Sequence, residues 1–347
     1  MTALLPRPPG SKQLAQADPA SLQSPHRSIP PDSSSPPRPE PSSTGDSLDA
    51  VKRAPEPGSV NAIIRTHSRT RLYVKPIYWT SDQLRLLGCQ FCLSELQPEQ
   101  RRDTTSLKSA PGVAKDKDAA NKLQRQEPSR DIIRAARQIC LIAIPEFKKD
   151  AMHDFLVANG FQCQKSERLP FRFNGHTASV LRTDGVWSVG SAAPSLAYVD
   201  LCNLATQRED RIYCTPRLKR WNQPVSILRS KKLDQHTPSN DAEDPYIMAI
   251  LIALARERRR KQQKEGSSTG TIDHNVSLIA VRGIPPRTLF FYTARIPSSF
   301  LNKLDRPSQF SPSCPILVSY RPISLMGSRA PEELRATLCC LLAAHKQ

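Results

Sequence analysis

The stretch from Asp244 to Lys264, DPYIMAILIALARERRRKQQK, restricts the fold more than any other part of the chain. Asp244 can cap a helix because its carboxylate accepts from the free amides of the first turn, and Pro245 suits the first helical position. Tyr246 to Ala255 is an unbroken apolar run, and a helix that is apolar all round must be covered on most sides. The run is about half of the roughly 20 residues that a membrane span needs. We therefore expect a long helix buried in the core of a domain.

Composition divides the rest of the chain. Residues 1–60 are rich in Pro and Ser and nearly lack aromatic and β-branched residues, so we expect a disordered arm that cannot bury enough apolar surface to fold. Residues 61–97 regain apolar and aromatic residues and are expected to be a short, partly ordered segment. Residues 98–128 are a charged linker. The core domain is expected to occupy 129–347.

The fold class expected for this core is α+β, a single domain with a mixed sheet packed on the 244–264 helix. Pro145 should open a helix that Gly160 closes. Asp184-Gly185 lies between two apolar runs and suits a type I′ turn, so 178–190 is predicted to be a β-hairpin. Strands are further expected at Cys140–Ile144, Ile212–Cys214, Val225–Leu228, 276–281, 289–294 and 316–320.

One triplet suggests a reaction. Glu146-Phe147-Lys148 has the E-x-K spacing of the restriction-endonuclease-like superfamily and is similar to its motif. That resemblance implies that a carboxylate holds a metal ion and that the lysine steadies the hydrolytic water. Asp184 and Asp200 could join this site. Pro145, however, should place Glu146 and Lys148 in the first turn of a helix instead of on a strand, and a Glu there also complements the helix dipole.

Cysteine residues give a second, weaker candidate. Cys89 and Cys92 form a lone C-x-x-C, and a zinc site would need two more ligands at comparable spacing. On a helix the two thiols would share a face. The nine cysteines follow no framework and no signal peptide precedes them, so we expect reduced thiols in an intracellular protein, cytoplasmic or nuclear.

Basic residues give a third candidate, because the chain carries 50 Lys and Arg against 32 Asp and Glu, a net charge of +18. Clustered cations beside an aromatic ring can contact phosphates and stack on a base. Solvated surface charge explains the same pattern. The candidate nucleic-acid contacts are Arg217, Lys219, Arg220, Trp221, Arg258, Arg259, Arg260 and Lys261.

The chain from about 180 to 322 resembles a family of uncharacterised fungal proteins. The stretches that carry this resemblance are TDGVWSVG, YCTPRLKRW, DPYIMAILIALARERRR, SLIAVRG and TLFFYTARIPSSFLNKLDRPS. The resemblance implies one domain and no catalytic residues.

Three functions therefore remain open. The first is a non-catalytic interaction module with an unidentified protein partner. The second is a divergent nuclease of the restriction-endonuclease-like kind, and the third is a basic nucleic-acid-binding domain without catalysis. No G-x-S-x-G, G-x-G-x-x-G or P-loop sequence is present, so the sequence indicates no cofactor, and it indicates no membrane contact.

Overall fold

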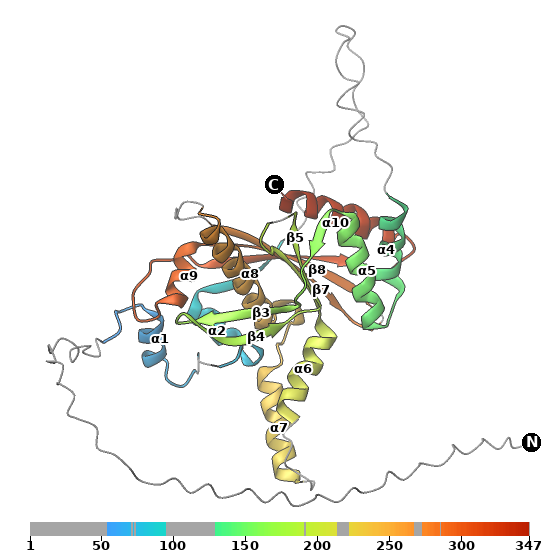
Figure 1. Ribbon diagram of the computed structural model, residues 1–347. Coiled ribbons are helices and arrows are strands. Elements are labelled where there is room, and N and C mark those ends of the chain that lie inside the picture. The colour runs from blue at the N-terminus through green and yellow to red at the C-terminus, as the bar shows by residue number, and fades with distance from the viewer. Residues whose placement is uncertain are drawn as a thin grey trace, which may run out of the picture. The chain divides into compact units, whose positions relative to one another are not determined.

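The computed structural model describes residues 54–70, 72, 74–94, 129–190, 192–213, 222–266, 273–284 and 286–346. They belong to one compact unit that spans 53–347. This unit is α+β, with a mixed sheet and helices on both of its faces (Figure 1), as the sequence predicts.

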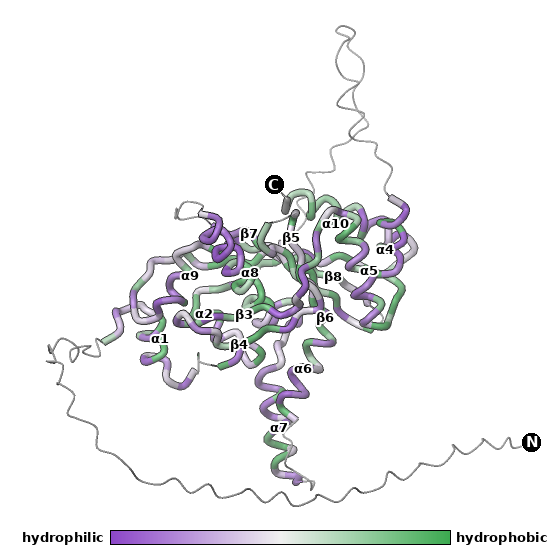
Figure 2. The backbone as a smooth tube through the Cα atoms, viewed as in Figure 1, coloured by the Kyte–Doolittle hydropathy of each residue, from purple (hydrophilic) through white to green (hydrophobic). Residues whose placement is uncertain are grey.

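The predicted central helix is α8 (Pro245–Lys264). The Asp244 carboxylate accepts a hydrogen bond from the Tyr246 amide at 2.9 Å, which is the expected N-cap. Every side chain from Pro245 to Arg256 is buried. Figure 2 shows the same change along the helix, from apolar at the start to polar at the end. None of the described helices is both long enough and apolar enough to span a membrane.

The main sheet of the described chain mixes parallel and antiparallel neighbours. The pairs β1–β9 and β6–β7 are parallel, and the other neighbouring pairs are antiparallel. In spatial order the strands are β1 (Cys89–Leu93), β9 (Ile316–Ser324), β8 (Thr288–Ile296), β7 (His274–Arg282), β6 (Leu196–Asp200), β5 (Gly185–Val189) and β2 (Phe161–Cys163).

Helices cover both faces of this sheet (Figure 1). Because side chains alternate along a strand, Ala197 and Val199 of β6 belong to the apolar cluster around α8, whereas Leu196 and Tyr198 belong to the cluster on the opposite face. The second cluster is built by α4 (Arg130–Leu141), α5 (Pro145–Ala158) and α10 (Ala330–Lys346).

The segment that the sequence sets apart, 61–97, joins this core as far as it is described. Its strand β1 pairs with β9, and Trp79, Leu84 and Leu87 are buried in the cluster around α8. The folded unit therefore starts before Ser129. The elements of this segment are α1 (Val60–Thr66), η1 (Pro76–Tyr78), α2 (Ser81–Leu87) and β1.

The hairpin predicted at Asp184-Gly185 is wrong. The strand before it, β4 (His176–Arg182), pairs instead with β3 (Arg168–Phe173) in a separate two-stranded sheet. The turn between those strands is Asn174-Gly175, with φ of 51° and 74°, the left-handed pair that an Asn-Gly turn provides. Gly185 is needed for another reason, since a Cβ there would lie 2.0 Å from the ring of the tryptophan two residues on.

Three predicted strands are also wrong. Cys140 and Leu141 end helix α4, Ile212 lies in α6 (Leu201–Tyr213), and Val225–Leu228 lies in α7 (Gln223–His236). The Asn222 side chain accepts from the Val225 amide at 3.2 Å, so α7 starts with an ordinary N-cap. Helices α6 and α7 contact each other and extend away from the sheet (Figure 1). The remaining described elements are η3 (Asp241–Glu243) and α9 (Ser298–Asp305).

Candidate functional site

Lys148 is the centre of the charged site that the structure brings together. Pro145 occupies the first turn of α5, as predicted, and the helix packs on the sheet through Met152 and Phe155. Lys148 precedes those residues by four and seven positions, so it lies on the same inward face. Its ammonium therefore points at the sheet, and the side chain is 1% exposed.

Asp200 receives that ammonium. It is the last residue of β6, and period-two alternation directs its side chain to the face that α5 covers. Its Oδ2 accepts from Lys148 Nζ at 2.7 Å, and its Oδ1 accepts from the Cys202 amide at 2.9 Å in the first turn of α6. The side chain is 2% exposed. One carboxylate thus joins α5, β6 and α6.

Asp184 lies next to this pair, just before β5. Its Oδ2 accepts from the Asp200 amide at 2.6 Å and its Oδ1 accepts from Asn203 Nδ2 at 3.3 Å. Burial raises the pKa of Asp184, and the negative charge of Asp200 adds to that increase, while the two hydrogen bonds act against it. The charged form is therefore less favoured here than in an aspartate exposed to water.

Two further charges complete the cluster at its more exposed side. Lys149 forms an ion pair with Glu167, with the side chains 39% and 49% exposed. The hydrogen bond to Glu167 is the main cause that raises the pKa of Lys149, and Asp184 contributes through its charge. The site as a whole holds two lysines and three carboxylates.

Glu146 does not join this cluster. It lies two residues before Lys148 on a helix, which is about 200° of rotation, so it points to solvent while Lys148 points inward. The E-x-K spacing therefore does not form a site here. Lys148, Asp184 and Asp200 do converge, over sequence separations of 52 and 16 residues.

The carboxylates of Asp184 and Asp200 are the groups of this site that could bind a metal ion. Two neighbouring carboxylates are the type of ligand that Mg²⁺ prefers. Here, however, both oxygens of each carboxylate already accept from the protein, and the Lys148 ammonium lies against Asp200. Within the described residues, no group of three or more His, Cys, Asp or Glu side chains could hold a metal. The arrangement does not fit a bound metal.

The cysteine candidate changes as well. Cys89 and Cys92 lie on strand β1, not on a helix, so an odd separation directs the thiols to opposite faces. Cys89 is buried, and burial raises its pKa to about 12, whereas Cys92 is exposed. The two thiols cannot share a metal ion in this arrangement.

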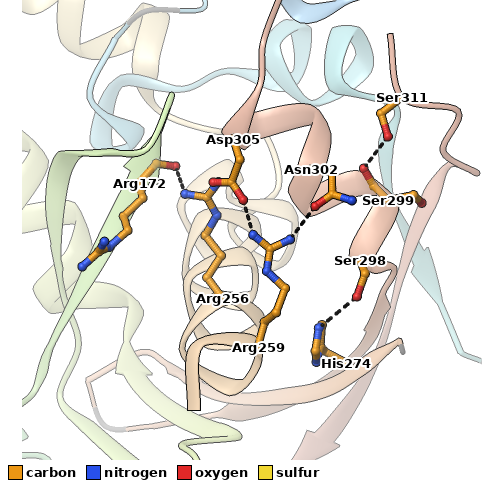
Figure 3. A network of polar contacts seen from close by, with 9 residues as sticks. All are labelled: Arg172, Arg256, Arg259, His274, Ser298, Ser299, Asn302, Asp305 and Ser311. Carbon is orange, nitrogen blue, oxygen red and sulfur yellow. Dashed lines mark hydrogen bonds and ion pairs between the residues drawn. The ribbon is translucent and has the colours of Figure 1, made fainter. Parts of the chain in front are cut away.

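The basic end of α8 divides into two groups. The first packs inward against α9, where Asp305 pairs with both Arg256 and Arg259, and Arg259 also donates to Asn302 at 2.9 Å (Figure 3). Burial lowers the pKa of Arg258. Arg259, one of the predicted nucleic-acid contacts, is therefore engaged by Asp305 and Asn302, and Arg258, another, is partly buried.

His274 lies close to Arg259 at this end of α8 (Figure 3). Its Nε2 lies 3.3 Å from Ser298 Oγ, and the residue is 2% exposed. Burial lowers its pKa to about 4, and the positive charges of Arg258 and Arg259 add to that effect. This histidine is kept neutral at physiological pH.

The second group borders an open groove of about 700 Å³ between the last turns of α8 and the segment 163–170. From α8 come Arg260, Lys261 and Lys264. From the facing segment come Lys165, before β3, and Arg168, the first residue of β3, both exposed. The sequence does not single them out because isolated cations form no visible cluster. Arg217, Lys219, Arg220 and Trp221 lie outside the described residues.

The chain was compared with protein families, curated proteins and solved structures. No family model, no curated protein and no solved structure matches the chain. The resemblance to fungal proteins and the resemblance to nucleases therefore stay predictions, and the function has to be argued from the arrangement of the residues.

Proposed function

We propose that this chain is a non-catalytic interaction module, in which Lys148, Asp184 and Asp200 hold the fold together instead of performing a reaction. The observation that carries the proposal is the internal pairing of the cluster. Each carboxylate oxygen of both aspartates accepts a hydrogen bond from the protein, and the lysine ammonium faces Asp200 at 2.7 Å.

The position of the cluster supports a structural role. It lies where α5 crosses the end of β6, where α6 begins and where β5 starts, so one set of charges fixes four elements. A buried ion pair is weak as a source of stability compared with apolar packing, but it can specify how elements fit together. Any packing of α5 on the sheet that separated Lys148 from Asp200 would leave two buried charges without a partner, so such a packing is costly.

The experiment is a cleavage assay beside a stability measurement. The full chain is incubated with labelled single- and double-stranded DNA and RNA in Mg²⁺, in Mn²⁺ and in EDTA, and its thermal unfolding is recorded. The proposal expects intact substrates under all three conditions. It also expects Lys148→Met to lower the melting temperature. Metal-dependent cleavage that Asp184→Asn abolishes while the melting temperature stays unchanged would overturn it.

A divergent nuclease is the second candidate. The observation in its favour is that Lys148, Asp184 and Asp200, three of the four residues predicted for this site, do converge at the carboxyl end of a strand that has a parallel neighbour. Ligand sites of α/β sheets commonly lie at such strand ends. Asp184 is the most accessible of the three, so Asp184→Asn is the variant that separates the two candidates.

A further inference from the structure

The groove beside the end of α8 has a marked charge imbalance. Five cations line it, Lys165, Arg168, Arg260, Lys261 and Lys264, together with one carboxylate, Glu257. The carboxylate already pairs with Arg260 at 3.1 Å. A ligand that complements the charge of this groove is therefore an anion.

Most of these cations are available to a ligand. Among the ion pairs of the described residues, none involves Lys165, Arg168 or Lys264. Lys261 lies 3.9 Å from Glu265 with both side chains partly exposed, and it adds its charge to the groove while it keeps this partner. The groove contrasts with the neighbouring inward-facing group, in which Asp305 already neutralises Arg256 and Arg259.

The two walls of the groove are held firmly. One wall is the ordered end of α8. The other is the short connection between β2 and β3 with the first residues of β3. The Gln164 amide donates to the Val186 carbonyl of β5 at 2.8 Å, and the Thr183 amide, just before β5, donates to the Glu167 carbonyl at 3.0 Å. Lys165 and Arg168 therefore stand on a fixed frame opposite the helix.

We propose that this groove binds the sugar–phosphate backbone of a nucleic acid. The inference rests on the proposed function, because it names the partner of a domain that acts by binding. Cations on two facing walls suit a ligand that carries negative charge along its length and on more than one side, as a phosphate backbone does. The net charge of +18 adds a long-range attraction for polyanions.

A lipid surface fits the groove less well. Proteins that lie on membranes present a basic face together with apolar side chains that insert among the lipids. Here the cations line a concave surface, and two of its apolar residues, Leu169 and Val186, are buried in the fold. An acidic protein segment shares only the charge and is distinguished by experiment.

The test measures binding of the full chain to fluorescein-labelled 20-nucleotide RNA, single-stranded DNA and duplex DNA by anisotropy over a range of salt concentrations. Lys165→Gln with Arg168→Gln removes two groove cations. The matched control, Arg134→Gln with Arg137→Gln, removes two exposed cations from α4 on the opposite face of the sheet. Both variants lower the net charge equally.

The groove variant is expected to weaken binding on the order of tenfold at 50 mM salt, and to reduce the slope of log affinity against log salt by roughly 1.5. Lys264→Gln, on the other wall, is expected to reduce the slope by about 1. The control variant is expected to change both quantities much less. Thermal unfolding of all variants establishes that they are folded.

Equal effects of the groove and control variants would overturn the inference, because charge alone would then explain binding. Groove-dependent binding of polyglutamate or of vesicles containing phosphatidylserine, as tight as that of the nucleic acids, would also overturn it. The bound probe is analysed on a denaturing gel after incubation in Mg²⁺. Cleavage there would contradict the proposed non-catalytic function. The comparison of salt slopes would still show whether the groove cations contact the nucleic acid.

Discussion

Replacing Lys148 with Met tests the structural role of the buried pair most directly. Met keeps the length of the aliphatic chain but removes the ammonium, so the Asp200 carboxylate, 2% exposed, loses its counter-charge and keeps only the Cys202 amide. Breaking a buried ion pair from one side costs about 3–5 kcal/mol in the free energy of unfolding. For a domain of this size that corresponds to a fall of roughly 6–20 °C in the melting temperature.

The reverse change should cost a similar amount. Asp200→Asn leaves the Lys148 ammonium, 1% exposed, without its carboxylate, although Asn can still accept from the Cys202 amide. The double variant leaves no charge on either member of this pair. Its remaining cost is a buried amide without an acceptor, about 1–3 kcal/mol. The double variant should therefore be several kcal/mol more stable than the sum of the single changes predicts.

Urea unfolding of the four proteins, followed by circular dichroism, measures that coupling free energy. The control is the same cycle on Lys149→Met and Glu167→Gln, an ion pair with side chains 39% and 49% exposed, for which a coupling of about 1 kcal/mol or less is expected. If the single changes at Lys148 and Asp200 added up within about 0.5 kcal/mol, the buried pair would not be the connection between α5 and β6, and the structural argument would fail.

Three more predictions concern the core. Leu251→Asp introduces a carboxylate at a position that is fully buried and should prevent folding, whereas Leu228→Asp, at a position 65% exposed on α7, should be tolerated; soluble expression and melting curves compare them. Gly185→Ala should destabilise the domain by about 1–3 kcal/mol in urea unfolding, because its Cβ would overlap a tryptophan ring that leaves no room. His274 has a native pKa of about 4 against 6.5 when unfolded, so its contribution to stability, about 3 kcal/mol, is complete above pH 6.5 and is lost as the pH falls to 4. His274→Gln should therefore flatten the pH dependence of the free energy of unfolding between pH 4 and 6.5, and an unchanged slope would contradict the lowered pKa.

The sequence was most informative where local chemistry and burial agree. The central helix could be predicted because Asp244 and Pro245 start it and because ten apolar residues in a row demand cover on every side. The strands β7, β8 and β9 followed from short apolar runs near the predicted positions. In these elements the propensity, the cap and the packing all favour the same structure.

The errors arose where a short apolar run fits either a helix or a strand. Val225–Leu228 contains two β-branched residues, but the N-cap Asn222 and the proline at 224 start a helix at Gln223, two residues before this run. The hairpin was assigned to Asp184-Gly185 although Asn174-Gly175, an equally good turn pair, lies ten residues before it. Two turn signals near each other cannot be ranked without knowing which strands pair.

The candidate site could be predicted from the sequence only in part, for a different reason. The E-x-K triplet led to Lys148, but the spacing that suggested a site is the one that directs Glu146 and Lys148 to opposite sides of a helix. The partners that Lys148 has, Asp200 and through it Asp184, come from strand ends that only the tertiary fold brings together. Such a cluster leaves no local pattern in the sequence.

The buried charges and the basic groove are connected through the same strands, and this connection explains why a binding domain would keep a costly ion pair. Asp200 fixes Asp184 through its backbone amide, and Asp184 stands at the start of β5. The adjoining Thr183 and Val186, the second residue of β5, bind the β2–β3 connection, which carries Lys165 and leads into Arg168. If the cluster were loosened, that wall of the groove would become mobile. Binding would then have to order Lys165 and Arg168 as well, and this entropy cost would weaken the affinity for the ligand. If the groove binds as proposed, its need for a firm frame is enough to account for Lys148 without a catalytic role.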